Sequence, residues 1–423
     1  MIVVTSGWFR TAAVSFSETE DMSPIDAEHR RLMAEVHVPG MTSAFIQGGR
    51  LHGIICCGVR GVQVPAPVDE NTVFDAASLS KPVFAHAVLQ LVDQGRLSLD
   101  APISEYLPAY IPADEPASRI TTGHVLSHST GLPNWRNSDL PLKTYFEPGE
   151  RFSYSGEGFL YLQKAVEALT GERIHSLVER LVLRPFGMDR SSFVWEWRFE
   201  PNRAYPHDAF GRPWLGGKPG EGNAAGSFQT TAADFARFLL RTLDGSGLRP
   251  DTAQSWLRPH VDVTHGKPQC LGPSDGSTTG VAWGLGWGLE PEEGTFFHWG
   301  DNGAYKAFVI GSLSTRDALV FFLNGASGLA IVPDLVAAFM PGTRPSLSWL
   351  GYGRHDSPAW RMLRAARTRG AASVWTEMEA AGLGDDDIVW IARGLGVANL
   401  DEDAQWLRER IRQRQVGSTA PQF

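Results

Sequence analysis

The stretch Asp75-Ala-Ala-Ser78-Leu-Ser-Lys81-Pro82 lies where a strand-like run ends and a long apolar helix is expected to begin. If Ser78 opens that helix, Lys81 follows three residues later on the same face, within hydrogen-bonding reach of the hydroxyl. Serine becomes a nucleophile when a base removes its proton, and lysine can be that base when burial lowers its pKa. The stretch therefore indicates a nucleophile with a built-in base or, as the simpler interpretation, a structural N-cap serine.

The residues after this stretch predict a helix over 79–94 that is buried on most of its sides. Gly95 ends the helix. Its apolar positions form a wide stripe made of Val83, Phe84, Ala87, Val88, Leu91 and Val92. A helix buried this deeply holds its N-terminus, and hence Ser78 and Lys81, in a rigid position.

The overall composition argues against several classes of function. The 423 residues carry a net charge of -9, which gives no reason to expect nucleic acid or an anionic membrane as a partner. Three cysteines cannot make a disulfide framework. The sequence also contains no run of eighteen apolar residues, the length needed to span a membrane. The first residues lack a basic region before an apolar run, so we expect a cytoplasmic protein unless a misassigned start codon hides an export signal.

The order of predicted elements indicates an α+β fold in which both ends of one region build a single sheet. Residues 22–36 predict an amphipathic helix, and the strands from 42 to 60 form a hairpin around Gly48-Gly49-Arg50. Three later strand-like runs, within 282–325, predict an antiparallel meander that pairs with the first hairpin. A helix over 331–339 should cover the sheet.

We expect two parts along the chain. Residues 1–342 form a catalytic domain, whose sheet comes from about 42–75 and 281–340 and whose mostly helical body comes from about 85–275. A cleft between sheet and body is the expected ligand site. Residues 343–423 form a C-terminal helical extension with helices at 357–369, 371–381, 385–394 and 401–414. The extension could be a lid, an oligomer contact or a partner site, and the oligomeric state is open.

Two further residues are candidates for the chemistry. Tyr154, in FSYSGEGF, carries a phenol that can act as acid or base when nearby cations lower its pKa. His298 lies on an apolar strand beside Gly300, which would leave room for a ligand to approach closely. The alternatives are a half-buried tyrosine with a satisfied hydroxyl and a structural histidine.

Three short motifs in the same order resemble a known family. SLSK at 78–81, YSG at 154–156 and HWG at 298–300 resemble the S-x-x-K, Y-x-N and [KH]-[TS]-G elements of the serine β-lactamase-like superfamily. GRLSLDAPISEYLP, HVLSHSTGL and AAGSFQTTAADFARF are similar to other signatures of this superfamily, and the resemblance spans about 25–340. Its nearest branches are class C β-lactamases, DD-peptidases and family VIII carboxylesterases, which implies a β-lactamase/transpeptidase-like fold.

The resemblance implies an acyl transfer in two steps, without a metal or cofactor. Ser78 would attack an ester or amide carbonyl, Lys81 and Tyr154 would move its proton, and water would release the acyl group. The backbone N–H groups of Ser78 and Asp301 would form the oxyanion hole.

The resemblance also implies a set of substrate-binding positions, and two of them depart from the pattern. The implied positions are Gly156, His298, Trp299 and Gly300. Gly156 stands where the family has asparagine, so the side-chain amide that would bind an acyl-amide substrate is absent, and Trp299 replaces a small hydroxyl residue. Lys306 or an arginine of the cleft could supply the charge that these positions lack.

We therefore expect a serine hydrolase that cleaves a small ester or amide through Ser78, most similar to carboxylesterases. β-Lactamase or D-amino-acid peptidase activity is the second enzymatic hypothesis, and acyl transfer or peptide cyclisation is the third. The non-enzymatic alternative is a penicillin-binding-like sensor that keeps the fold without turnover.

Overall fold

The computed structural model describes residues 23–108, 110–111 and 113–418. The N-terminal segment, in which we found no basic region before an apolar run, lies outside these residues. Among the helices of the described ranges, none is long and apolar enough to cross a membrane.

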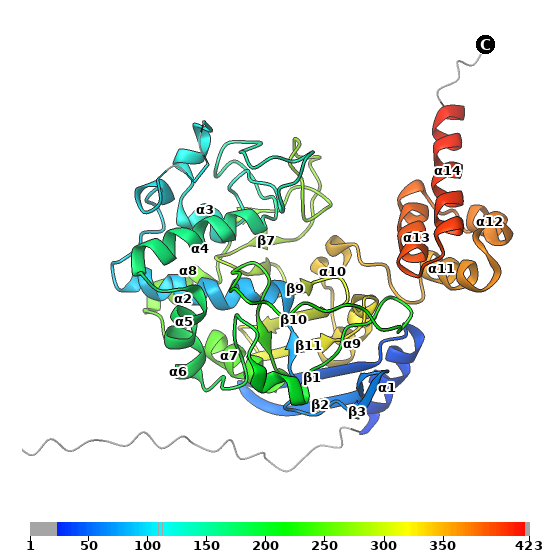
Figure 1. Cartoon of the computed structure of the whole chain (residues 1–423). Helices are drawn as coiled ribbons and strands as arrows, with labels where there is room; N and C mark the ends of the chain where they lie inside the picture. Colours follow the sequence, from blue (N-terminus) through cyan, green and yellow to red (C-terminus); the bar gives the residue numbers. More distant parts are fainter. Residues whose placement is uncertain (1–22, 109, 112, 419–423) are drawn as a thin grey trace, which may run out of the picture.

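A nine-stranded antiparallel sheet forms the centre of the molecule, in the order β3-β2-β1-β11-β10-β9-β8-β7-β6 (Figure 1). The first hairpin pairs with the last strand of the region, since Met41 of β1 lies opposite Leu323 of β11. A separate two-stranded ladder joins β4 to β5. The strands are β1 (Gly40–Gln47), β2 (Arg50–Gly61), β3 (Val64–Pro67), β4 (Phe74–Asp75), β5 (Gln229–Thr230), β6 (Val261–Asp262), β7 (Ala282–Trp283), β8 (Gly288–Glu290), β9 (Thr295–Asp301), β10 (Lys306–Ser312) and β11 (Asp317–Leu323).

Helices cover both faces of this sheet. On one side lies the helical body, with α2 (Ser80–Asp93), α3 (Thr122–Leu126), α4 (Gly156–Thr170), α5 (Ile174–Val178), α6 (Arg184–Phe186), α7 (Ala232–Asp244) and α8 (Pro250–Trp256). The other helices are α1 (Ser23–Glu35), α9 (Val332–Phe339), α10 (Pro345–Leu350), α11 (Pro358–Arg369), α12 (Ala371–Ala380), α13 (Asp385–Val397) and α14 (Asp401–Ser418). Short 3-10 turns include η1 (Ala77–Leu79) and η6 (Gly328–Ile331).

Alternate side chains of the central strands enter two different hydrophobic cores. On β10, Ala307 and Val309 join the core shared with the helical body, whereas Phe308 and Ile310 join the core on the opposite face. Successive side chains of a strand point to opposite faces of the sheet. The central strands are therefore apolar throughout, because both of their faces are buried.

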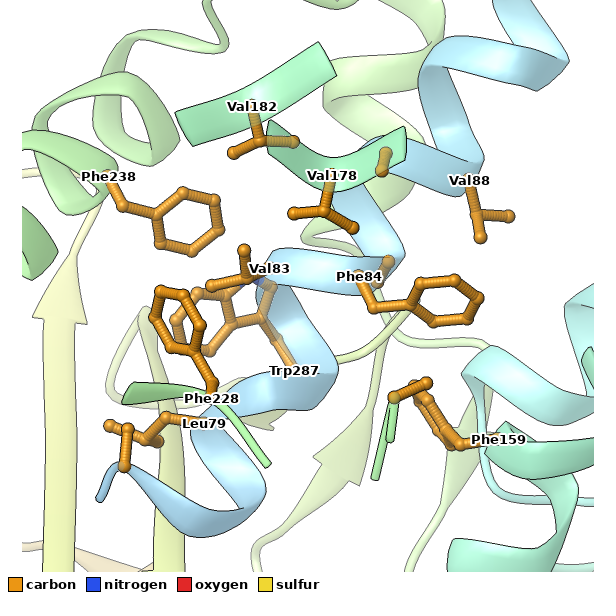
Figure 2. Packing of buried hydrophobic residues seen from close by; sticks show 14 of the residues in the cluster. Leu79, Val83, Phe84, Val88, Phe159, Val178, Val182, Phe228, Phe238 and Trp287 are labelled. Carbon is orange, nitrogen blue, oxygen red and sulfur yellow. The ribbon is translucent and has the colours of Figure 1, made fainter. Parts of the chain in front are cut away.

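Helix α2 lies within the first core and is packed on several sides. Figure 2 shows Val83 and Phe84 pointing toward side chains from other elements, among them Phe159 and Val178. The rings of Phe84 and Phe159 lie 6.4 Å apart. This packing fixes the start of α2, which carries Lys81.

The structure confirms the fold class and the pairing of the early hairpin with the late strands. Three local details differ from expectation. The helix predicted over 79–94 begins with the 3-10 turn η1, so Ser78 lies in a tighter turn just before α2. The run around His298 forms two strands, β9 and β10, because residues 302–305 turn the chain. Helix α10 was not expected.

The C-terminal helices α10 to α14 share the second core with the sheet. Trp349 and Trp360 are buried in the same cluster as Phe297 and Phe308 of the central strands. Trp349 also donates its Nε1–H to the carbonyl of His265, at 3.1 Å. Of these helices, α10 packs directly against β8, whereas α11 to α14 pack mainly against one another beside the sheet (Figure 1).

Candidate active site

Ser78 and Lys81 lie side by side where η1 leads into α2. The Nζ atom of Lys81 is 3.0 Å from Oγ of Ser78. The carbonyl of Ala225 lies 2.7 Å from the same Nζ and 3.3 Å from the same Oγ. If the amine is neutral, one N–H can be donated to Ala225 while the lone pair accepts the serine proton. The expected pair of nucleophile and base is thus in place geometrically.

The charge of Lys81 depends on its burial. The side chain is fully buried, and burial lowers its pKa well below the usual value of 10.5. A buried amine favours the neutral form because the charged form loses its hydration. Lys81 is therefore suited to accept a proton near neutral pH.

The turn that presents Ser78 contains a strained residue. Ala77 adopts a left-handed backbone conformation with φ 49°, which is uncommon for a residue with a side chain. Its N–H is donated to Oδ1 of Asp75 at 2.8 Å, and the side-chain amide of Asn302 donates to the same oxygen at 2.9 Å. Asp75 thus stabilises the turn by accepting two hydrogen bonds. Burial raises the pKa of its carboxyl to about 6.

Tyr154 packs against this pair. The Nζ atom of Lys81 lies 4.7 Å from the centre of the tyrosine ring. The Tyr154 hydroxyl is buried without a hydrogen bond of normal geometry, although it lies near enough to Ser78 to favour the phenolate slightly. Burial has the larger effect and raises the pKa of Tyr154 above its usual value of 10. The expectation that nearby cations lower this pKa is not met, because burial outweighs the other effects on the phenol.

His298 lies behind the reacting pair and is not among the residues that line the cleft. Its Nδ1–H is donated to the Trp299 carbonyl at 2.8 Å, and its Nε2 is buried without a partner among the described residues. Burial and the nearby Lys81 lower the pKa of His298 to about 3, so it is neutral. The structure places His298 where it can influence Lys81 and Tyr154, and separates it from the space for substrate.

Sequence reasoning missed a second buried histidine, His128. Its Nδ1 accepts the N–H of Ser155 at 2.9 Å, and its ring stacks on Tyr154 with 4.2 Å between ring centres. Because Nδ1 is an acceptor, the proton of the neutral ring is on Nε2, which is buried without a partner among the described residues. The HVLSHSTGL segment marked this region, but only the fold brings His128 under Tyr154.

Strand β9 approaches η1 closely because of Gly300. A Cβ atom at this position would lie 2.5 Å from the carbonyl oxygen of Ala76. The space that we expected a ligand to use is therefore occupied by the chain just before Ser78. Trp299 and Asp301, on the other face of β9, line the cleft together with Ser78 and Tyr154. The backbones expected to form the oxyanion hole thus border one space.

Asn134 supplies an amide next to Gly156, where we expected none. The N–H of Gly156 is donated to Oδ1 of Asn134 at 2.9 Å and to its backbone carbonyl at 3.1 Å. A Cβ atom at position 156 would lie 2.7 Å from the ring of Trp135. The 134–135 loop therefore fills the place of a side chain at 156. No sequence pattern links these positions, which are 22 residues apart.

The cleft above Ser78 has a volume of about 780 Å³ and one wall from the C-terminal helices. The helical body contributes Asn134 and Trp135 to this cleft, and β9 contributes Trp299. The opposite wall comes from Trp349 to Gly353 and from one side of α13. Tyr352 donates its hydroxyl to Oδ2 of Asp301 at 3.0 Å, and Lys306 is paired with the other oxygen. Lys306 is therefore not free to bind a substrate charge.

The sequence model of the Beta-lactamase family matches residues 25–336. The chain belongs to the Beta-lactamase family. The match covers the described sheet and helical body, including Ser78, Lys81 and Tyr154, and ends before α10. The suspected superfamily is thereby confirmed, and the protein is a serine hydrolase.

Relatives of this β-lactamase-family enzyme include a penicillin-binding protein and an esterase. Penicillin-binding protein 4 of Amycolatopsis lactamdurans is 28% identical over 330 residues, which cover 72% of this chain and 85% of that protein. Esterase EstB of Burkholderia gladioli is 29% identical over 248 residues, which cover 51% of this chain and 60% of the esterase. The relatives therefore support serine hydrolase chemistry without selecting one substrate.

Solved structures show the same fold at low sequence identity. The octameric penicillin-binding protein homologue from Pyrococcus abyssi superimposes with a TM-score of 0.65 and 21% identity, covering 83% of this chain and 82% of that one. A class C β-lactamase superimposes with a TM-score of 0.62 and 19% identity, covering 76% and 97%.

Proposed function

We propose that this enzyme hydrolyses small carboxylic esters through an acyl-enzyme on Ser78. The observation that carries the proposal is the 3.0 Å contact between Ser78 Oγ and the fully buried Nζ of Lys81, at the floor of an open cleft. A neutral amine at that distance can take the serine proton as Oγ attacks a carbonyl carbon. The backbone N–H groups of Ser78 and Asp301 would bind the oxygen that becomes negative.

Tyr154 completes the proton transfers. Its raised pKa keeps the phenol protonated, so it would donate its proton to the leaving oxygen as the carbon–oxygen bond breaks. The tyrosine then regains a proton from the Lys81 ammonium, and the leaving group departs as an alcohol. A water molecule attacks the acyl-enzyme in the second step and gives a proton to Lys81. Lys81 passes this proton to Oγ of Ser78 as the bond between Oγ and the acyl carbon breaks, which releases the acid and restores both residues.

Aromatic side chains around Ser78 favour an apolar group next to the ester bond. Trp299 packs on Tyr154, with 4.7 Å between ring centres, at the position where a small hydroxyl residue was expected. Trp135 on the opposite side is 45% exposed. Apolar walls bind an acyl chain by removing its surface from water. The likeness to esterase EstB agrees with this choice.

Two reagents test the proposal. Wild-type enzyme should react with a fluorophosphonate probe and hydrolyse 4-nitrophenyl butyrate, whereas Ser78→Ala should do neither. Ser373→Ala, which removes an exposed hydroxyl on α12, is the matched control and should behave as wild type. Equal labelling and turnover in wild type and Ser78→Ala would overturn the proposal.

A second candidate function is hydrolysis of a β-lactam or a D-amino-acid peptide. The observation that favours it is Asn134, whose amide lies next to Gly156 and lines the cleft with Ser78. Such an amide can bind the carbonyl of an acyl-amide substrate. Nitrocefin and a D-alanyl anilide test this activity, and turnover of either that exceeds ester turnover would make it the main function.

A further inference from the structure

One side of helix α13 forms part of the cleft that holds Ser78. Asp386, Trp390 and Arg393 line this space, and their spacing of four and three residues places them on one helical face. The family match ends at residue 336, so this wall lies outside the region shared with the family. The part of the cleft opposite Ser78 and Tyr154 is thus built by residues that lie C-terminal to the family match.

The residues of this wall that precede α13 are fixed to the rest of the site by direct contacts. The Tyr352 hydroxyl binds the carboxylate of Asp301, and the Trp349 indole binds the carbonyl of His265. Trp390 packs edge-on against Trp360, with 5.1 Å between ring centres, and Trp360 is buried in the core that the extension shares with the sheet. A substrate bound at Ser78 therefore meets a preformed surface on α13.

The carboxylates that line the cleft already have partners. Asp301 is paired with Lys306, and Asp387 accepts the N–H of Gly384 at 3.1 Å. Asp386 lies 3.8 Å from Nζ of Lys267, where both side chains are largely exposed.

Arg393 differs from these carboxylates, because it has no ion pair among the residues that the structure describes, and its side chain is exposed. A guanidinium binds a carboxylate through two parallel N–H donors, which makes it selective for that group. The unpaired charge on this wall is thus suited to a substrate anion.

We propose that α13 selects substrates which carry a carboxylate at a distance from the ester bond, and that Arg393 binds this carboxylate while Trp390 packs against the linking atoms. The inference rests on the proposed ester hydrolysis at Ser78 and adds the substrate class. Arg393 acts here as a specificity-determining residue, because it lies in the cleft and takes no part in the proton transfers.

Matched substrates test the selection. Mono-4-nitrophenyl suberate and 4-nitrophenyl octanoate have acyl chains of equal length and differ in the terminal carboxylate. In wild type, kcat/KM should favour suberate, and Arg393→Gln should lower kcat/KM for suberate roughly tenfold while changing that for octanoate less than twofold. Arg393→Glu should lower it further. Arg361→Gln, an exposed arginine of α11 outside the cleft, is the control and should keep the preference.

A second pair places the carboxylate on the leaving group. If 4-(butanoyloxy)benzoate, rather than suberate, shows the Arg393-dependent preference over phenyl butanoate, the carboxylate binds on the leaving-group side and the proposal stands. If Arg393→Gln changes the ratio for neither pair, the proposal is overturned.

If wild type hydrolyses no ester, the proposed function fails. Calorimetry with monomethyl suberate then decides the inference, which requires binding that Arg393→Gln abolishes and Arg361→Gln keeps.

Discussion

At the scale of single residues, the proposed chemistry depends on the charge of Lys81. Its pKa is lowered well below 10.5 by burial, so the unfolded chain binds more protons than the folded chain between these two pKa values. Burying this amine therefore lowers the free energy of unfolding once the pH falls below about 10.5. The loss of stability reaches its full size below the lowered pKa. Near neutral pH, the buried amine of Lys81 therefore reduces the stability of the fold.

Lys81→Met keeps an apolar side chain of similar length and removes the titrating group. We expect kcat/KM to fall by about 10²–10⁴ because the base is lost. We also expect a higher melting temperature at pH 7, with a gain that shrinks as pH rises toward 10.5. Ester turnover and thermal denaturation across pH measure both effects. Equal stability of variant and wild type at every pH would show that the pKa of Lys81 is not lowered.

Two substitutions of Asn134 separate its effect on stability from its effect on substrate binding. Asn134→Asp keeps the oxygen that accepts the Gly156 N–H but loses the NH₂ donor, whereas Asn134→Ala loses both. We expect the Asp variant to keep its melting temperature and the Ala variant to lose about 1 kcal/mol of stability.

Both Asn134 variants should lower kcat/KM for an N-acylated amino-acid ester about tenfold relative to 4-nitrophenyl butyrate. If Asn134→Asp hydrolyses both esters as wild type does, the amide of Asn134 does not contact the acyl group.

At the scale of elements, the site requires β9 and η1 to lie unusually close. Gly300→Ala would place a methyl group 2.5 Å from the carbonyl oxygen of Ala76, a backbone atom with little freedom to move. We expect a loss of about 1–3 kcal/mol of stability and a larger relative loss of kcat, because β9 and Ser78 would separate.

Gly217→Ala is the matched control, since a Cβ atom there meets nothing within 4 Å. Chemical denaturation and ester kinetics measure both variants. A Gly300→Ala enzyme with wild-type kcat would show that the distance between β9 and the Ser78 turn does not limit catalysis.

At the scale of the whole molecule, the C-terminal helices and the sheet share one core. Trp349 is 5% exposed and packs against Trp283, Phe297 and Trp299 of the sheet. We expect Trp349→Ala to cost about 3–5 kcal/mol and to lower ester turnover, because the same side chain lines the cleft.

Trp197→Ala, at a residue that is 77% exposed, should change stability by less than about 0.5 kcal/mol. Calorimetry should show one unfolding transition for the wild-type enzyme. Two separate transitions would contradict a shared core, and they would show that the extension folds on its own.

The sequence allowed prediction of elements with strong local patterns. The spacing of apolar residues after Ser78 predicted α2, and glycines at 48 and 49 predicted the turn between β1 and β2. The same patterns did not predict the 3-10 turn at Ser78, because a shift of one hydrogen bond leaves the apolar spacing unchanged. They also missed the split of the long run into β9 and β10, where both strands are apolar.

By itself, the sequence determined that Ser78 and Lys81 lie side by side, because they are close along the chain and their separation on one turn follows from local geometry. Tertiary structure alone decided what surrounds them. Asn134 reaches Gly156, and α13 reaches the cleft, only through packing between segments far apart in sequence. The pKa values of Lys81 and Tyr154 also depend on burial, which results from all the elements packed around them.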